Sequence, residues 1–206
     1  MANSMKPSEI YNALLAFKKV ESDLCSLKSQ CTSFSTCGTK SATKVIDFDE
    51  VKNEYCRNNA ISPLWKSVDG VCAKQNDSLF LFIEKKSWSQ FFRHQEHSKE
   101  RIIKQANDFS LNEKYEKSIE ICSNIVGQTN LFTEDNHAFL FFSDINPDTS
   151  PLTAFQYNLN MLAGTSTEII KLAIGASLQE ICNVKCKKRR FVFCRDFDSY
   201  VNGNEN

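Results

Sequence analysis

Two stretches of the sequence decide the fold: residues 68–70, Val-Asp-Gly, and residues 79–86, LFLFIEKK. Five large apolar residues in a row open the second stretch, which is typical of a strand buried on both faces. The Asn-Asp pair at residues 76–77 supplies a turn, so the two stretches are predicted to form an antiparallel hairpin. Such a hairpin brings Asp69 alongside Glu84.

Side chains alternate along the second strand, and this decides which of its charges share a face. One face is predicted to carry Phe80, Phe82, Glu84 and Lys86, and the other Leu81, Ile83 and Lys85. Burying ions at the end of a central strand costs several kcal/mol each, so Glu84 and Lys86 are expected where the strand opens toward solvent or a metal. Two neighbouring carboxylates repel each other, and a hard divalent cation relieves that repulsion.

An acid, a gap of fourteen residues and then Glu-x-Lys after an apolar strand together resemble the D-x(n)-E-x-K signature of the PD-(D/E)XK nuclease superfamily. The resemblance covers residues 45–100, with Val68 where the family often has proline. It implies a restriction-endonuclease-like fold and metal-dependent hydrolysis of nucleic-acid phosphodiester bonds, in DNA more than in RNA. A catalytically inactive module of the same fold, acting through protein contacts, is the alternative.

The resemblance also implies a role for each motif residue. Asp69 and Glu84 would ligate Mg²⁺ or Mn²⁺ together with the main-chain carbonyl of Lys85, and Lys86 would activate the attacking water or stabilise charge. The family often adds an acid from the helix before the first core strand. Glu50 or Glu54 could supply it, and Glu50 is favoured because it lies earlier in its helix.

The rest of the chain alternates between helical and strand patterns, which predicts an α/β fold. We expect a mixed central sheet of about four strands flanked by helices, with an extra N-terminal helix over residues 7–28. The division is residues 1–44 for that helix and a Ser/Thr/Cys-rich linker, 45–200 for the nuclease-like domain and 201–206 for a tail. The polar segment from Asp196 is expected to fray. Further helices are predicted at 48–58, from 87 onward, at 112–125 and at 152–182, and further strands at 138–142 and 190–195.

The charge is balanced, with 25 basic and 25 acidic residues. A nucleic-acid-binding protein must then concentrate its positive charge locally, because phosphate neutralisation dominates such affinity. The concentrated basic patch is Lys187, Lys188, Arg189 and Arg190, which we expect to contact a phosphate backbone, although basic loops before strands are also common.

Partners and location follow from the remaining patterns. The sequence has no run of eighteen apolar residues and no signal-peptide profile at its start, so we expect a cytoplasmic protein without membrane contact. The amphipathic helix at 7–28 could dock to a protein partner or to a second copy of the chain. Nine cysteines are expected to be mostly reduced, small core residues.

Overall fold

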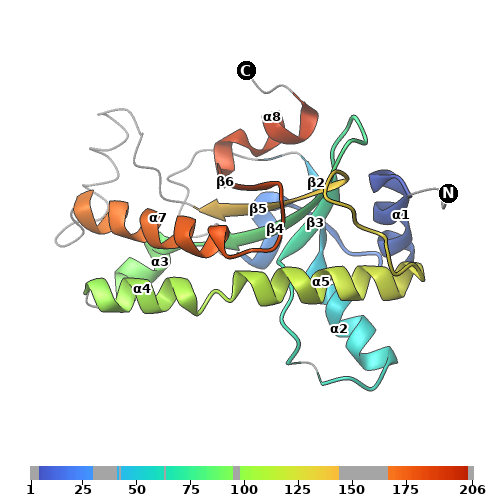
Figure 1. The fold of residues 1–206 in the computed structure, drawn as a ribbon, viewed down its shortest axis with the longest axis horizontal. Coiled ribbons are helices and arrows are strands. Elements are labelled where there is room, and N and C mark those ends of the chain that lie inside the picture. The colour runs from blue at the N-terminus through green and yellow to red at the C-terminus, as the bar shows by residue number, and fades with distance from the viewer. Residues whose placement is uncertain are drawn as a thin grey trace.

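The computed structural model describes residues 5–29, 41, 43–62, 64–94, 98–143 and 167–203, which form an α/β fold around one mixed sheet (Figure 1). The described strands follow one another across the six-stranded sheet in sequence order. They are β1 Glu21–Asp23, β2 Lys44–Asp47, β3 Gly70–Ala73, β4 Phe80–Lys86, β5 His137–Ser143 and β6 Arg189–Phe193.

The type of strand pairing changes once, in the middle of the sheet. Strands β1 to β4 are antiparallel neighbours, whereas β4, β5 and β6 run parallel. The two parallel connections carry the helices that cover one face, because a parallel crossover needs a long connection. Those described between β4 and β5 are α3 Trp88–His94, α4 Lys99–Asn107 and α5 Leu111–Val126, and α7 Thr167–Cys182 precedes β6.

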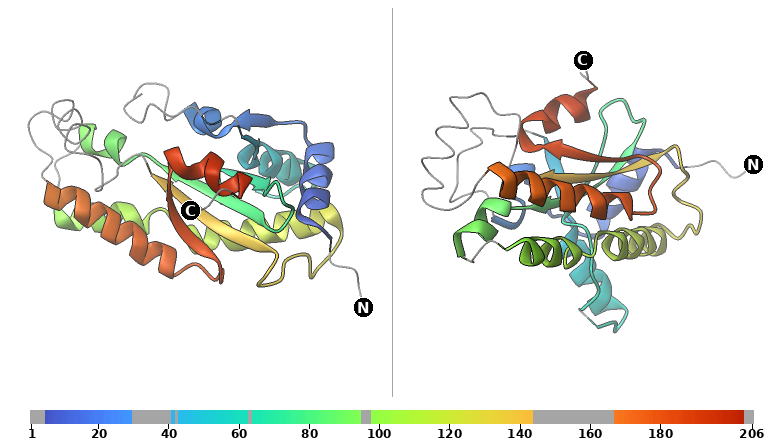
Figure 2. Two further views of the ribbon diagram at one scale, coloured as in Figure 1. Left: turned by 90° about the horizontal axis from the view of Figure 1, so that it is seen from above. Right: turned by 60° about the vertical axis from the view of Figure 1, so that its left-hand side comes forward.

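The sheet separates two apolar cores, and β4 contributes to both. Phe80 and Phe82 enter the core under the helices α4, α5 and α7, joined there by α1 Pro7–Phe17 and α2 Phe48–Asn58. Leu81 and Ile83 enter the core on the other face, under the 3₁₀ helix η1 Leu24–Ser29 and α8 Phe197–Asn202. Figure 2 shows the two layers on either side of the sheet. The predicted alternation along β4 is confirmed.

Several elements lie where the sequence predicts them. Helix α2 begins after Asp47, whose side chain accepts a hydrogen bond from the Glu50 N–H, as expected of an N-cap. Helix α5 ends at Gly127, which adopts the left-handed conformation with φ of 76°. The hairpin of β3 and β4 is antiparallel, with Gly70 opposite Ile83.

The predicted sheet of about four strands is too small, and the predicted N-terminal helix is too long. The chain leaves the helix after Phe17, and residues 21–23 become β1, paired with β2. Apolar residues continue at helical spacing past this point, so periodicity could not reveal a three-residue strand that exists only through pairing. The linker prediction falls mostly outside the described residues, as does the start of the helix predicted at 152–182.

The C-terminal segment is ordered where fraying was expected. Phe197 and Val201 of α8 are 0% and 2% exposed, respectively, in the core beneath β4 and β5. Three of the six residues of this short helix are buried and hold it against the sheet. Polar residues surround them in the sequence, so the segment had the pattern of a frayed end. All seven cysteines in the described ranges are free thiols, and five of them are buried.

Helix α2 is an excursion between two strands that pair directly. Asp47 at the end of β2 lies opposite Gly70 at the start of β3. The Phe48 N–H donates to the Asp69 carbonyl at 3.0 Å, and the Ser67 hydroxyl donates to Asp49 at 2.7 Å. The chain therefore closes this excursion at its base before entering β3.

We expect Gly70→Ala to lower the free energy of unfolding by about 1–3 kcal/mol, because overpacking strains a tight core. A Cβ atom there would lie 3.2 Å from both the Ile46 carbonyl oxygen and the Leu27 methyl groups. Gly175→Ala is the control, since nothing lies within 4 Å of its Cβ position on α7. Urea unfolding measures both, and equal midpoints for the two variants would contradict the close approach.

His137 opens β5 with both ring nitrogens engaged. Its Nδ1 lies 2.6 Å from the Thr133 carbonyl, so Nδ1–H donates, and Nε2 then accepts from the Tyr115 hydroxyl at 2.5 Å. This arrangement holds the neutral imidazole. Burial lowers the pKa of His137 below its ordinary value of 6.5, and the charge of Lys188 also lowers it.

This lowered pKa predicts an acid-sensitive contribution to stability. Below pH 6.5 the unfolded chain protonates this histidine while the folded chain does not, so the contribution is present above that pH and is lost as the pH falls. We expect wild type to lose more stability than His137→Gln between about pH 7.5 and about pH 5. Urea unfolding across this range measures it, and parallel pH curves for the two proteins would count against the assignment.

Candidate active site

Asp69 is held at the start of the hairpin by its own backbone and by β4. Its N–H donates to the Ile83 carbonyl at 2.9 Å, and its Oδ2 accepts from the Lys85 N–H at 2.7 Å. The side chain is fully buried. The hairpin register therefore places this acid next to the Glu-Lys-Lys segment, as the sequence predicts.

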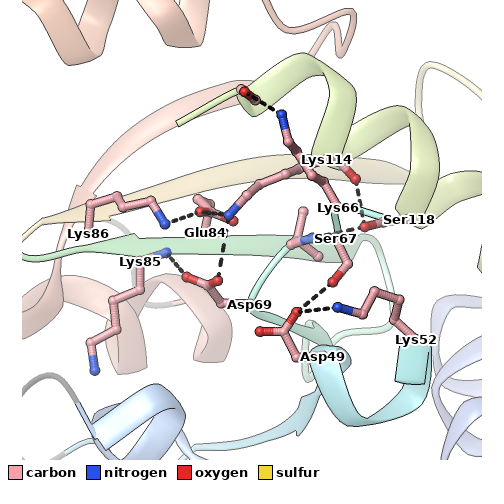
Figure 3. A network of polar contacts seen from close by, with 12 residues as sticks. Asp49, Lys52, Lys66, Ser67, Asp69, Glu84, Lys85, Lys86, Lys114 and Ser118 are labelled. Atoms are coloured by element: carbon pink, nitrogen blue, oxygen red, sulfur yellow. Dashed lines mark hydrogen bonds and ion pairs between the residues drawn. The ribbon is translucent and has the colours of Figure 1, made fainter. Parts of the chain in front are cut away.

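Glu84 is also fully buried, and two ammonium groups meet at one of its oxygens (Figure 3). The Nζ atoms of Lys86 and Lys114 each lie 2.5 Å from Glu84 Oε1. Lys114 Nζ is also 4.0 Å from Asp69 Oδ1, so one ammonium lies within 4.0 Å of both acids. We call Asp69, Glu84, Lys86 and Lys114 the acid–lysine cluster.

Lys114 is the member of the cluster that the sequence reasoning missed. It lies on the buried stripe of α5 with Leu111, Tyr115 and Ser118, at spacings of three and four. Ser118 fixes that stripe against the sheet, because its hydroxyl accepts from the Val68 N–H at 3.0 Å and donates to the Lys114 carbonyl at 2.7 Å. A lysine within an apolar helix stripe is the signal that could have identified it.

Burial works against both charges of the central ion pair. It raises the pKa of Glu84 above the usual 4.5, as does the adjacent Asp69 carboxylate, while the two lysines oppose this rise. Burial likewise lowers the pKa of Lys114 below its usual 10.5, with the Lys86 charge adding to the effect and the two acids opposing it. The four charges balance one another, yet each is costly to hold away from water.

The oxygen donors fit a divalent cation in one respect. Glu84 Oε2 is buried and has no hydrogen-bond partner among the described residues. A buried carboxylate oxygen without a partner is costly, and an oxygen-seeking cation satisfies it. Two carboxylates and the Lys85 carbonyl, with water, make a donor set that Mg²⁺ or Mn²⁺ accepts. The described residues contain no cluster of three or more His, Cys, Asp or Glu side chains that could hold a metal.

Lys85 points to the opposite face of the sheet, as the alternation predicts. Its ammonium donates to the carbonyls of Leu24, Cys25 and Leu27 at 3.1, 3.3 and 3.4 Å, respectively. The side chain is therefore a buried anchor for η1. Only its backbone faces the acid–lysine cluster, through the N–H that binds Asp69.

The acidic residue of α2 that points toward the hairpin is not the one that the sequence predicts. Glu50 is exposed, and Glu54 forms ion pairs with Lys18 and Arg57. Asp49 is instead the acid of this helix that reaches back to the hairpin, through Ser67 (Figure 3). The structure does not bring Glu50 to the cluster. Helix position alone could not show this, because adjacent residues of a helix point about a quarter turn apart.

The basic patch at residues 187–190 spans the start of β6, which β5 separates from β4. In the strand register Arg190 lies opposite Leu140, which in turn lies opposite Ile83. Acidic neighbours already engage part of it, since Lys187 pairs with Glu134 at 3.0 Å and Lys188 with Asp135 at 3.8 Å. The structure therefore does not join this patch to the acid–lysine cluster.

The apolar face of α1 is used within the chain. Ile10 and Leu14 are fully buried in the core shared with α5 and the sheet.

None of the described helices is long and apolar enough to cross a membrane. Comparison with protein-family models, curated proteins and solved structures gives no match for the chain.

Proposed function

We propose that the chain is a divalent-metal-dependent nuclease of the PD-(D/E)XK type, hydrolysing phosphodiester bonds in DNA more than in RNA. One observation carries the proposal: the hairpin brings the buried acids Asp69 and Glu84 within reach of one ammonium, and Lys86 pairs with the same Glu84 oxygen. Ordinary folding stability does not require paired acids and lysines at a strand end, because such charges cost several kcal/mol to bury. Concentrated costly charges are a mark of functional sites.

The order of elements supports a restriction-endonuclease-like core. Helix α1, the antiparallel strands β2 to β4, the helices through α5 and the parallel strand β5 resemble the αβββαβ order of that superfamily, with β1 added and α2 inserted between β2 and β3. Asp69 immediately precedes β3 and Glu84 lies on β4, so the two acids belong to the antiparallel part, where the superfamily places its motif.

The residues divide the chemistry among themselves. Asp69, Glu84 and the Lys85 carbonyl would hold Mg²⁺ or Mn²⁺, which when bound polarises the phosphate and lowers the pKa of a water molecule. The Lys86 ammonium would orient that water or stabilise the charge that develops on the phosphate oxygens. Because Lys86 is bound to Glu84, its position follows from the strand.

The proposal is tested with purified wild type and Asp69→Asn on duplex DNA, single-stranded DNA and RNA, with Mg²⁺, Mn²⁺ or EDTA. Wild type should cleave DNA in either metal, and EDTA or the substitution should stop cleavage. Cleavage that persists in EDTA, or in a folded Asp69→Asn protein, overturns the mechanism. Stronger cleavage of RNA than of DNA would reverse the substrate preference only.

The balanced charges of the cluster favour a second candidate function. Two lysines neutralise two acids without any added ion, which suits a catalytically inactive module of the same fold that acts through protein contacts. Isothermal titration separates the two, because the inactive module should bind no Mn²⁺.

A further inference from the structure

We infer that the ammonium of Lys114 holds the place of the divalent cation between Asp69 and Glu84, and must leave before the metal can bind. This inference rests on the proposed function and adds a regulatory step to the same site. It gives helix α5 control over metal loading. The chain would then pass between a lysine-closed and a metal-loaded state.

The position of the ammonium is the first observation. Lys114 Nζ lies 2.5 Å from Glu84 Oε1 and 4.0 Å from Asp69 Oδ1. A cation bridging these two carboxylates would have to occupy nearly the same space, because metal–oxygen distances are about 2.0–2.6 Å. Either cation, the Lys114 ammonium or the metal ion, relieves the repulsion between the two buried carboxylates.

The incomplete satisfaction of Glu84 is the second observation. Oε1 receives two ammonium groups, while Oε2 is buried without a partner among the described residues. Two lysines on one oxygen therefore leave the other oxygen of this buried carboxylate unsatisfied. A metal ion that replaces the Lys114 ammonium could bind both oxygens, so the metal-loaded state would satisfy Glu84 more fully than the lysine-closed state.

The position of Lys114 on a separate helix allows its ammonium to be replaced by a metal ion. Both acids belong to the hairpin, whereas Lys114 reaches them from α5, which Ser118 fastens to the Val68 N–H. The Lys114 side chain is 13% exposed, so its long stem can turn toward solvent while the helix stays in place.

The test compares Mn²⁺ binding by wild type, Lys114→Met and Lys117→Met in isothermal titration. Removing the competing ammonium should tighten Mn²⁺ binding at least tenfold in Lys114→Met. Lys117→Met is the matched control on the same helix, since Lys117 pairs with Glu120 and contacts Trp65, and its affinity should equal that of wild type. Thermal unfolding in EDTA should show Lys114→Met destabilised and rescued by Mn²⁺ more than wild type.

A measurement on the wild-type chain covers the case in which Lys114→Met fails to fold. In protein labelled with ¹⁵N-lysine, the enclosed ammonium should give a protected Nζ–H signal in EDTA, identified by its loss in Lys114→Arg. Saturating Mg²⁺ should abolish that signal. A signal unchanged in saturating Mg²⁺ overturns the inference.

The outcomes separate this inference from the proposed function. If wild type cleaves with Mn²⁺ and Asp69→Asn does not, while Lys114→Met binds Mn²⁺ no tighter than wild type, only the inference falls. If neither wild type nor Lys114→Met binds Mn²⁺ and no metal-dependent cleavage occurs, both fall.

Discussion

Glu84→Gln should reduce metal-dependent cleavage by at least about 100-fold while the chain remains folded. Glutamine keeps the shape of the side chain, so packing in the core beside Phe82 is retained. It removes the charge that would bind a divalent cation and that pairs with Lys86 and Lys114. Single-turnover cleavage of a DNA duplex at saturating Mn²⁺ measures the loss.

The stability of Glu84→Gln provides the control for that result. Two opposing effects act on it: the variant no longer buries a carboxylate, but it leaves two ammonium groups with a weaker partner. We expect the free energy of unfolding to change by no more than about 1–3 kcal/mol. Circular dichroism should show the native fold. Full cleavage activity in the folded variant would remove Glu84 from the mechanism.

Neighbouring lysines should give opposite results when each is changed to methionine. Lys85→Met should lower the free energy of unfolding by about 2–4 kcal/mol, because a buried cation that satisfies three carbonyls of η1 is lost. Its catalytic rate, measured below the unfolding temperature, should fall far less than its stability suggests. Urea unfolding gives the first quantity and initial rates the second.

Lys86→Met is the matched comparison, one residue along the same strand. Its side chain is 18% exposed and pairs with the buried Glu84 carboxylate, which Lys114 still contacts in the variant, so the free energy of unfolding should fall by about 1–3 kcal/mol. Cleavage should fall about 100-fold if its ammonium stabilises developing charge. If Lys86→Met proved the more destabilised variant and Lys85→Met the less active one, the assignment of the two faces would be reversed.

The hairpin could be predicted from sequence because local chemistry specifies it. An apolar run, a turn and strict alternation fix which face each of residues 80–86 occupies, and the pairing of Gly70 with Ile83 then follows. Helix α2 could be predicted equally well, because Asp47 is a typical N-cap residue. These features depend on neighbours in the chain.

Long-range features could not be predicted in the same way. Strand β1 has three residues and exists through pairing with β2, and the inward turn of Lys114 depends on how α5 packs on the sheet. The choice of Asp49 over Glu50 depends on the helix orientation, which one sequence does not reveal. The separation of the basic patch from the acids depends on the strand order across the sheet, because β5 lies between β4 and β6.

The excursion that carries α2 has a consequence for how this protein can diversify. Its two ends meet in the Asp47–Gly70 strand pair and in the hydrogen bond from Phe48 to Asp69, so the sheet is closed beneath it. Doubling the length of a loop closed in this way costs only about 0.6 kcal/mol. Extra length could therefore be added to this excursion, next to the acids, without disturbing the strand register, as long as the buried face of α2 is kept in the core. This makes the position a natural place for new recognition surfaces to evolve.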